Sequence, residues 1–351
     1  MGVDFAVYKG SESGQIVEAK GHRDLGPTEV VVKISHRGVC GTDEHFRHAD
    51  QGLGHEGVGV ITETGSMVDA LSDFRVGDRV GMSWVQKICE HCDACLSGEL
   101  QSLKGGPEWL MQLHVGHQNQ CINKEEFGTA NHDQGCFGSA LAWDVSCLFK
   151  VPDEIESEYA GPLMCGGATV WSPLYNFGIK PGSRVGIVGV GGLGHLGIQF
   201  AAKMGMEVVA FSGSENKKQQ AMELGASEFH VAKGPGGLDK VGEISELLIT
   251  ASVLLDMVYM PVLALGALVF PLTVSTKSLK LTPLGLIGQS LRVIGNGTAS
   301  TTSIRAMLRF AAKQGVKPII EKFPMTRAGV EEAMAKLREG KVRYRGVLVA
   351  H

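Results

Sequence analysis

This chain of 351 residues has little net charge for its length. It carries 33 Lys and Arg against 37 Asp and Glu, which gives a formal net charge of −4. A surface without a strong excess of positive charge argues against binding to nucleic acid or to an anionic membrane. Hydrophobic residues at 44% and charged residues at 20% are ordinary proportions for a globular domain.

The beginning of the chain lacks the apolar core of a secretion signal, because MGVDFAVYKGSES carries charges early. We therefore expect a cytoplasmic protein whose eight cysteines are thiols or metal ligands rather than disulfides. The longest apolar stretch, 253–274, is divided by Pro261, Gly266 and Pro271. This pattern predicts a packed helix and then a buried strand, not a membrane span.

The pattern of hydrophobic residues differs between the first part of the chain and its centre. The first 150 or so residues hold short β-type runs, such as EVVVKIS and GVGVITE, which predict a partly open β-barrel. The centre alternates strand-like and helical segments, from SRVGIVGV through GGLGHLGIQFAAKMG to EVVAFSG. This alternation predicts a doubly wound parallel sheet of the Rossmann type. The tail predicts helices near 302–314 and 326–339 and a final strand, RGVLVA.

Cys40, His55 and Cys165 form a candidate zinc site, with Glu56 directly after the histidine. Two thiolates and one imidazole suit zinc, and a fourth position would remain open for water or a substrate oxygen. A glycine-rich loop, GVGGLG at 189–194, follows in the sequence. A metal that polarises a C–O bond, together with a dinucleotide site, indicates hydride transfer at a carbonyl carbon.

The residues around these ligands resemble the zinc-dependent medium-chain alcohol dehydrogenases. From Gly54 to Val68 the chain matches the family's zinc signature, GHE followed by Gly59 and Gly65. GTDEHF and PLMCGGATV look most like its cinnamyl-alcohol-dehydrogenase branch, which reduces aldehydes with NADPH. The resemblance implies an α/β fold with a GroES-like catalytic domain and a Rossmann NADP-binding domain. Its expected divisions are 1–160 and 298–351 for the catalytic domain and 161–297 for the cofactor domain.

The same resemblance assigns roles beside the zinc. Glu56 would sit behind the metal, and Asp43 would accept the free N–H of His55 and fix its tautomer. Thr42 would contact the substrate oxygen, and His45 would pass the proton to solvent, for which an imidazole has a suitable pKa.

A second cysteine cluster departs from the family pattern. Cys89, Cys92 and Cys95 have the spacing of a structural zinc site, but Leu103 stands where the fourth cysteine is expected. One interpretation is that this lobe has lost its metal. The other, which we favour, is that Cys121 is the fourth ligand and that 102–119 is an inserted segment. Cys136 and Cys147 are expected to be core cysteines.

The cofactor site is expected at the glycine-rich loop and at the tip of the next strand. The loop residues are Gly189, Gly191, Gly192, Leu193 and Gly194, which would bring backbone amides to the pyrophosphate. The strand tip has no acid to bind a ribose 2′-hydroxyl. Its candidate ligands for a 2′-phosphate, which favour NADP over NAD, are Ser212, Ser214, Lys217 and Lys218. Glu215 is a nearby acid that argues the other way.

We therefore expect a zinc- and NADP(H)-dependent oxidoreductase that acts on a small alcohol or aldehyde and forms a homodimer. One alternative keeps the fold and reduces an activated C=C bond, as zinc-free relatives do. The intact ligand set disfavours it. Another alternative is a non-enzymatic zinc-bound structural protein, and the proton-relay pair Thr42 and His45 disfavours that one.

Overall fold

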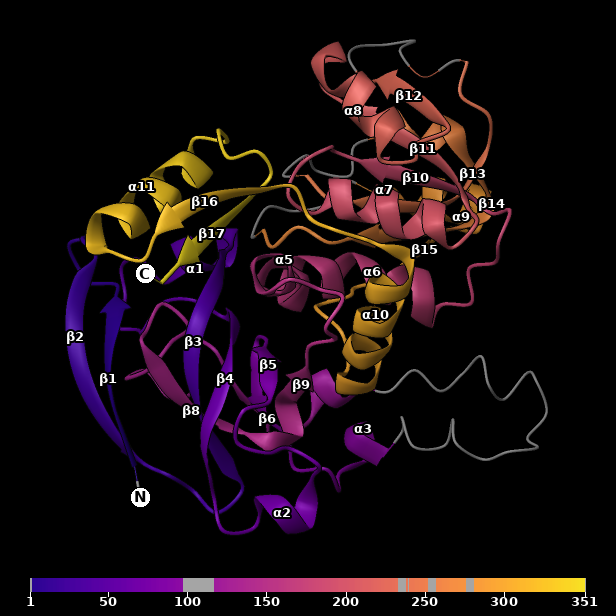
Figure 1. Cartoon of the computed structure of the whole chain (residues 1–351). Coiled ribbons are helices and arrows are strands. Elements are labelled where there is room, and N and C mark those ends of the chain that lie inside the picture. Colours follow the sequence, from indigo (N-terminus) through magenta and orange to yellow (C-terminus); the bar gives the residue numbers. More distant parts are fainter. Residues whose placement is uncertain are drawn as a thin grey trace. The chain divides into compact units, whose positions relative to one another are not determined.

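The computed structural model (Figure 1) describes residues 2–96, 117–232, 238, 240–251, 257–275 and 281–350. They belong to two compact units. Unit 1 comprises residues 1–168 and 300–351, and unit 2 comprises residues 169–299. The sequence predicted divisions after residues 160 and 297, whereas the compact units divide after residues 168 and 299. Most of the expected insertion, 102–119, lies outside the described residues.

Unit 1 is built on a seven-stranded, mostly antiparallel sheet. Its strands are β3 (Glu29–Val39), β4 (Glu56–Thr64), β5 (Arg79–Met82), β8 (Ala140–Asp144), β9 (Leu148–Lys150), β16 (Ile320–Pro324) and β17 (Arg345–Val349). They run in the order β16-β17-β3-β4-β5-β9, and β8 also pairs with β3. The end of the chain thus returns to the first domain, because β17 lies antiparallel beside β3.

Two small ribbons complete the β-structure of this unit. β1 (Gly2–Lys9) pairs with β2 (Val17–Asp24), and β6 (Val85–Lys87) pairs with β7 (Glu125–Glu126). The large sheet packs a core of mostly branched side chains from several strands, such as Val30, Val32, Ile61 and Val80. Such side chains fit the pleated surface of strands, which explains why the β-type runs of the sequence fold here.

Short helices and two longer ones surround the unit 1 sheet. They are α1 (Gly41–His45), α2 (Val68–Leu71), α3 (Asp93–Leu96), α5 (Ser157–Pro162), α10 (Thr301–Gln314) and α11 (Arg327–Arg338). The Ser300 hydroxyl caps α10 by accepting a hydrogen bond from the Ser303 amide, and Gly315 ends this helix with a φ of 66°. Both devices satisfy backbone groups that a helix end leaves without partners.

Unit 2 holds a six-stranded sheet in which all pairs are parallel. Its strands are β10 (Arg184–Val188), β11 (Glu207–Ser212), β12 (Glu228–Val231), β13 (Ile244–Ile249), β14 (Leu263–Pro271) and β15 (Arg292–Val293). Their order, β12-β11-β10-β13-β14-β15, is that of the doubly wound dinucleotide-binding fold. The strand order reverses between β10 and β13, so the ligand site of such a sheet is expected at the ends of these strands.

The helices of unit 2 are α6 (Ala168–Asn176), which begins at the boundary, α7 (Gly194–Lys203), α8 (Lys218–Glu223) and α9 (Pro283–Gln289). Figure 1 shows α7 lying against the sheet, directly after β10 and its glycine-rich turn. In the described part of the apolar stretch 253–274, a 3₁₀ segment, Met257–Val262, leads into the mostly buried β14. No described helix is both long and apolar enough to cross a membrane.

Candidate metal centre and cofactor site

The four residues of the expected zinc site come together in unit 1. Cys40 lies at the start of α1, just after β3, while His55 and Glu56 lie at the start of β4. These segments are adjacent because Gly38 of β3 pairs with Glu56 of β4. Cys165 lies in a π-helical turn, Leu163–Gly167, between α5 and α6. Such turns widen a helix and are frequent at functional sites.

Donor atoms from Cys40, His55, Glu56 and Cys165 all lie within 4.8 Å of one another. The Nδ1 atom of His55 is 2.8 Å from Asp43 Oδ1, so the buried carboxylate accepts a hydrogen bond from that nitrogen. This contact fixes the tautomer and leaves the Nε2 lone pair available. Nε2 of His55 and Oε2 of Glu56 are buried without a hydrogen-bond partner among the described residues.

This donor set fits a zinc ion. Buried polar atoms without partners cost free energy, and a cation held between them would remove that cost. A hydrogen bond from Cys165, together with His55, lowers the pKa of Cys40 well below its ordinary value, whereas the same sulfur pair and burial raise the pKa of Cys165. Two thiols, one imidazole and a nearby carboxylate match the chemistry of an open zinc site.

Arg345 is a neighbour of this centre that the sequence did not point to. Its guanidinium donates a hydrogen bond to Glu56, and both side chains are buried. Burial raises the pKa of the Glu56 carboxyl to about 7, although Arg345 acts against that rise. The sequence offered one signal for this contact: Arg345 begins the otherwise apolar strand RGVLVA. A charged residue in such a strand is expected to be buried, and a buried charge is seldom found without a partner.

Thr42 and His45 lie on α1, beside Cys40. The Thr42 hydroxyl oxygen is 3.7 Å from the Cys40 sulfur, whereas His45 is exposed. The short helix therefore carries a hydroxyl beside the metal centre and an imidazole in contact with water. Their roles in proton transfer stay a prediction.

Aromatic rings form a wall against the metal centre. The His55 ring lies 5.5 Å from Trp84 and 5.1 Å from Phe127, measured between ring centroids, and Phe46 packs on Phe127 at 4.9 Å. Phe46 and Phe127 were not predicted as part of this wall from the sequence. Phe46 is the last residue of the GTDEHF segment but was given no role there, whereas Phe127 belongs to no motif and only tertiary folding brings its ring beside His55.

The second cysteine cluster also comes together, and Cys121 is part of it. Sulfur–sulfur distances are 3.6 Å for Cys92–Cys95, 3.9 Å for Cys92–Cys121 and 3.5 Å for Cys89–Cys121. Zinc–sulfur bonds of 2.3 Å in a tetrahedron would place sulfurs about 3.8 Å apart. Backbone amides of Ile122 and Cys95 lower the pKa of Cys92 to about 6, which favours the thiolate form that binds metal.

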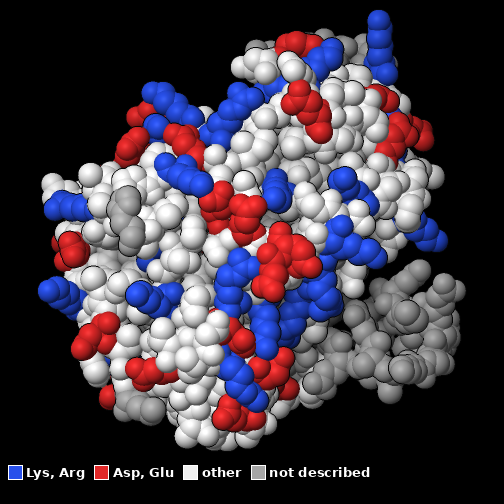
Figure 2. Space-filling view, in the orientation of Figure 1, with Lys and Arg blue, Asp and Glu red and all other residues white. Residues whose placement is uncertain are grey.

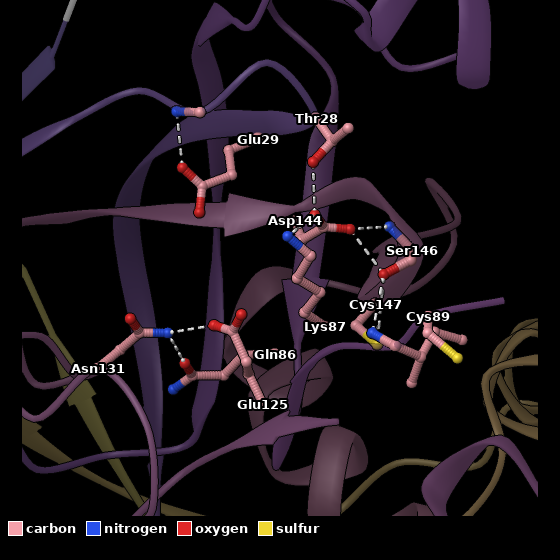
Figure 3. A network of polar contacts seen from close by, with 12 residues as sticks. Thr28, Glu29, Gln86, Lys87, Cys89, Glu125, Asn131, Asp144, Ser146 and Cys147 are labelled. Carbon is pink, nitrogen blue, oxygen red and sulfur yellow. Dashed lines mark hydrogen bonds and ion pairs between the residues drawn. The ribbon is translucent and has the colours of Figure 1, made fainter. Parts of the chain in front are cut away.

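A polar network holds the chain that leads into this lobe (Figure 3). Asp144 accepts hydrogen bonds from the Thr28 hydroxyl at 2.7 Å and from the Ser146 hydroxyl at 2.6 Å. The Ser146 oxygen in turn accepts from the amide of Ile88, the residue before Cys89. The first thiol of the lobe, that of Cys89, is thus positioned by the sheet of unit 1.

Cys136 and Cys147, which were expected to be core cysteines, are both buried.

The glycine-rich loop of unit 2 follows β10. Gly189 has a φ of 96°, which favours glycine, and an added Cβ there would lie 2.6 Å from that of Ala251. A Cβ on Gly191 would meet no atom within 4 Å, so this backbone is open to a ligand. A Cβ on Gly194 would collide with the Gly189 carbonyl. Close packing at the first and third glycines with an open second one fits a pyrophosphate-binding turn.

The side chains at the strand tip make contacts within unit 2, and their role at a 2′-phosphate stays a prediction. The Lys217 ammonium donates to the Val190 carbonyl at 2.7 Å, so it reaches back to the glycine-rich loop. Lys218 pairs with Glu215 at 2.9 Å. The hydroxyl of Ser212 accepts from the Ser214 amide at 3.4 Å. Side-chain contacts of this kind cannot be predicted from the spacing of residues in the sequence.

Residues 26–153 match the family model of the alcohol dehydrogenase GroES-like domain. The chain is 32% identical to NADP-dependent alcohol dehydrogenase C 1 of Mycolicibacterium smegmatis, covering 93% of this chain and 91% of that protein. It is also 32% identical to aldehyde reductase AdhA of Synechocystis sp., covering 92% of each. A cinnamyl alcohol dehydrogenase structure from Sorghum bicolor superposes with a TM-score of 0.85, at 27% identity and over 99% of this chain and 98% of that one.

These similarities define the class of protein. The chain is an oxidoreductase with a GroES-like domain and a Rossmann-type domain. It belongs to the zinc-dependent medium-chain alcohol dehydrogenase family, in its cinnamyl-alcohol-dehydrogenase-like branch.

Proposed function

We propose that this protein transfers a hydride between NADPH and a small aldehyde or primary alcohol at the metal centre of unit 1. The observation that carries the proposal is the donor set of Cys40, His55 and Cys165, in which His55 Nε2 is buried and unpaired. Relatives with similar sequences are named for alcohol and aldehyde chemistry. Reduction of a C=C bond and a purely structural role are not favoured.

The residues around the metal centre would have separate roles in the reaction. Zinc, when bound by Cys40, His55 and Cys165, would polarise the substrate oxygen, and the cofactor would supply or accept the hydride. Asp43 keeps the proton on His55 Nδ1, which would leave the Nε2 lone pair available to bind the metal. The Thr42 hydroxyl would hand a proton to the developing alcohol oxygen, and the exposed His45 would exchange it with water.

The aromatic wall would set the substrate class. Trp84 and Phe127 present ring surfaces beside His55 and exclude water from that side. Apolar surface of this kind binds apolar or aromatic bodies and leaves the reacting oxygen to the metal. The proposed substrates are therefore apolar or aromatic aldehydes.

The cofactor proposal concerns unit 2. The glycine-rich loop would hold the pyrophosphate, and Ser212, Ser214, Lys217 and Lys218 would favour the 2′-phosphate of NADP. The Lys217 ammonium group already donates a hydrogen bond to the Val190 carbonyl of the loop. A bound 2′-phosphate would either replace this carbonyl as the acceptor or accept a second hydrogen bond from the same ammonium group. We also propose a cytoplasmic homodimer, whose interface would use exposed apolar residues of unit 2.

The test is the oxidation of NADPH with a panel of aliphatic and aromatic aldehydes, followed by absorbance. Wild type should prefer NADPH to NADH, and Ser212→Asp should narrow or invert this preference because a carboxylate repels the 2′-phosphate. Thr42→Val should lower turnover roughly 10²–10⁴-fold without loss of zinc. If no aldehyde supports oxidation of either cofactor by zinc-loaded protein, the proposed function is wrong.

A further inference from the structure

A cavity of about 500 Å³ in unit 1 is separate from both sulfur clusters. Its walls come from the end of α2 and the loop after it, from Glu90 in the cysteine lobe, from the segment around β9 and from α10. None of the eight residues of the two candidate metal sites lines it. Phe74, Val145 and Leu308 give it an apolar surface. Its volume lies in the range of small-molecule sites.

Two arginines of α10 line this cavity without forming an ion pair with a described residue. Arg305 and Arg309 are four residues apart, so they lie on the same side of the helix. Neither guanidinium group makes a hydrogen bond or an ion pair with any described residue. Arg305 is partly buried and lies 5.8 Å from the centroid of the Phe149 ring, which leaves its N–H groups available. In Figure 2, Lys and Arg side chains lie next to Asp and Glu side chains in the part of the face where Figure 1 places α10.

The other charged groups of the cavity offset these arginines only in part, through the attraction of Glu90 and Asp73 for Arg305. Lys150 pairs with Asp73 at 3.0 Å and with Asp78 at 3.2 Å, so the carboxylate of Asp73 is already compensated. Glu90 is the remaining acid, and it is exposed and makes no ion pair among the described residues. The lining therefore keeps an excess of positive charge at Arg305 and Arg309.

The hydroxyl groups of the lining are already engaged. Ser72 donates to the Val68 carbonyl at 3.0 Å, and Ser146 donates to Asp144 at 2.6 Å. A ligand in this cavity would thus find its strongest free donors on the two guanidinium groups. Planar guanidinium groups match the two oxygens of a carboxylate better than they match a neutral oxygen.

We propose that this cavity is a second small-molecule site, which binds a carboxylate anion with an apolar or aromatic body. Arg305 and Arg309 would hold the carboxylate, and Phe74, Val145 and Leu308 would cover the body. The excess positive charge selects the anion, and the apolar walls select against small hydrated anions such as acetate. This site is independent of the proposed aldehyde reduction.

Titration calorimetry of the full-length, zinc-loaded protein with 3-phenylpropanoate tests this proposal without any turnover. The neutral analogue 3-phenylpropanamide and acetate serve as matched probes. Wild type should bind the phenylpropanoate saturably and bind both other probes at least about tenfold more weakly, since charge-assisted hydrogen bonds are the strong ones. Arg305→Gln and Arg309→Gln should each weaken the binding of phenylpropanoate by roughly tenfold.

Arg327→Gln is the control variant, because it removes an exposed arginine of α11 that does not line the cavity. It should bind phenylpropanoate as wild type does. Arg305→Lys, which keeps the charge, decides the matter if Arg305→Gln does not fold, and it should bind more weakly than wild type. The proposal is overturned if wild type shows no saturable binding. It is also overturned if the α10 variants bind unchanged, since the carboxylate would then occupy another site such as the metal centre.

Discussion

At the scale of single residues, two buried arginines of unit 1 show how differently a charge can be accommodated. Arg37 donates hydrogen bonds to four backbone carbonyls, those of Ile34, Ser35, Cys136 and Gly138, and its burial lowers its pKa to about 10. Arg345 instead meets the carboxylate of Glu56. The first arginine joins β3 to the segment around Cys136 and Gly138, whereas the second compensates a charge beside the metal centre.

Arg345→Leu should therefore be costly. The change leaves the Glu56 carboxylate buried without its partner, and breaking a buried pair in this way typically costs roughly 3–5 kcal/mol. We expect the free energy of unfolding in urea to fall by an amount of that order. The double variant Arg345→Leu with Glu56→Leu should recover much of the loss. Equal stability of Arg345→Leu and wild type would show that Glu56 does not need this charge.

Tyr259 allows a prediction about pH. This tyrosine is buried in the core of unit 2, and burial raises its pKa from 10.0 to about 12. The unfolded chain therefore loses this proton first, so the contribution of Tyr259 to stability decreases as pH rises from about 10 to 12. Tyr259→Phe should lose less stability between pH 9 and 11 than wild type does. Tyr175→Phe, at an exposed tyrosine of the same unit, should follow wild type; identical pH profiles for all three proteins would contradict this assignment.

At the scale of elements, the cysteine lobe joins a local motif to a distant residue. Cys89, Cys92 and Cys95 come from one short segment, whereas Cys121 follows the end of the predicted insertion, 102–119. Cys121→Ala should remove about one zinc ion per chain and lower the unfolding temperature, because structural zinc contributes folding free energy directly. Cys165→Ala should remove the other ion and turnover while largely sparing the fold.

Metal content by atomic emission, together with thermal unfolding, would measure both effects. Wild type is expected to hold two zinc ions per chain. A wild type with a single ion that Cys121→Ala retains would mean that the lobe is free of metal and that its four thiols meet for another reason.

The elements themselves were largely predictable from the sequence. β10 and β11 are short, continuous apolar runs, which are typical of parallel strands buried on both faces, and the helical segment α7 lies between them; these are local properties of the sequence. What the sequence could not give are contacts fixed by tertiary packing. Arg345 meets Glu56 across 289 positions of the chain, and Lys217 donates to Val190 rather than pointing freely outward. Neither contact can be predicted from the spacing of residues in the sequence, because each depends on how the tertiary fold brings distant segments together.

At the scale of the whole molecule, unit 2 exposes an apolar face that a monomer would leave in water. Leu284 and Ile287 of α9 are 80% and 75% exposed, and Leu265 of β14 is 78% exposed. α9 packs against β14, so these side chains belong to one region of the unit. Exposed apolar patches of this kind commonly mark interfaces, which supports the proposed homodimer.

Ile287→Glu should therefore convert the dimer to a monomer. The substituted carboxylate would have to lose its hydration when two copies meet, and an uncompensated buried charge costs several kcal/mol, enough to shift the dissociation constant by orders of magnitude. Size-exclusion chromatography with light scattering would measure the mass at micromolar concentration. Val76→Glu places the same charge on an exposed apolar position of unit 1 and should leave the dimer intact. A dimer that persists in Ile287→Glu would move the interface elsewhere, and a monomeric wild type would refute the homodimer itself.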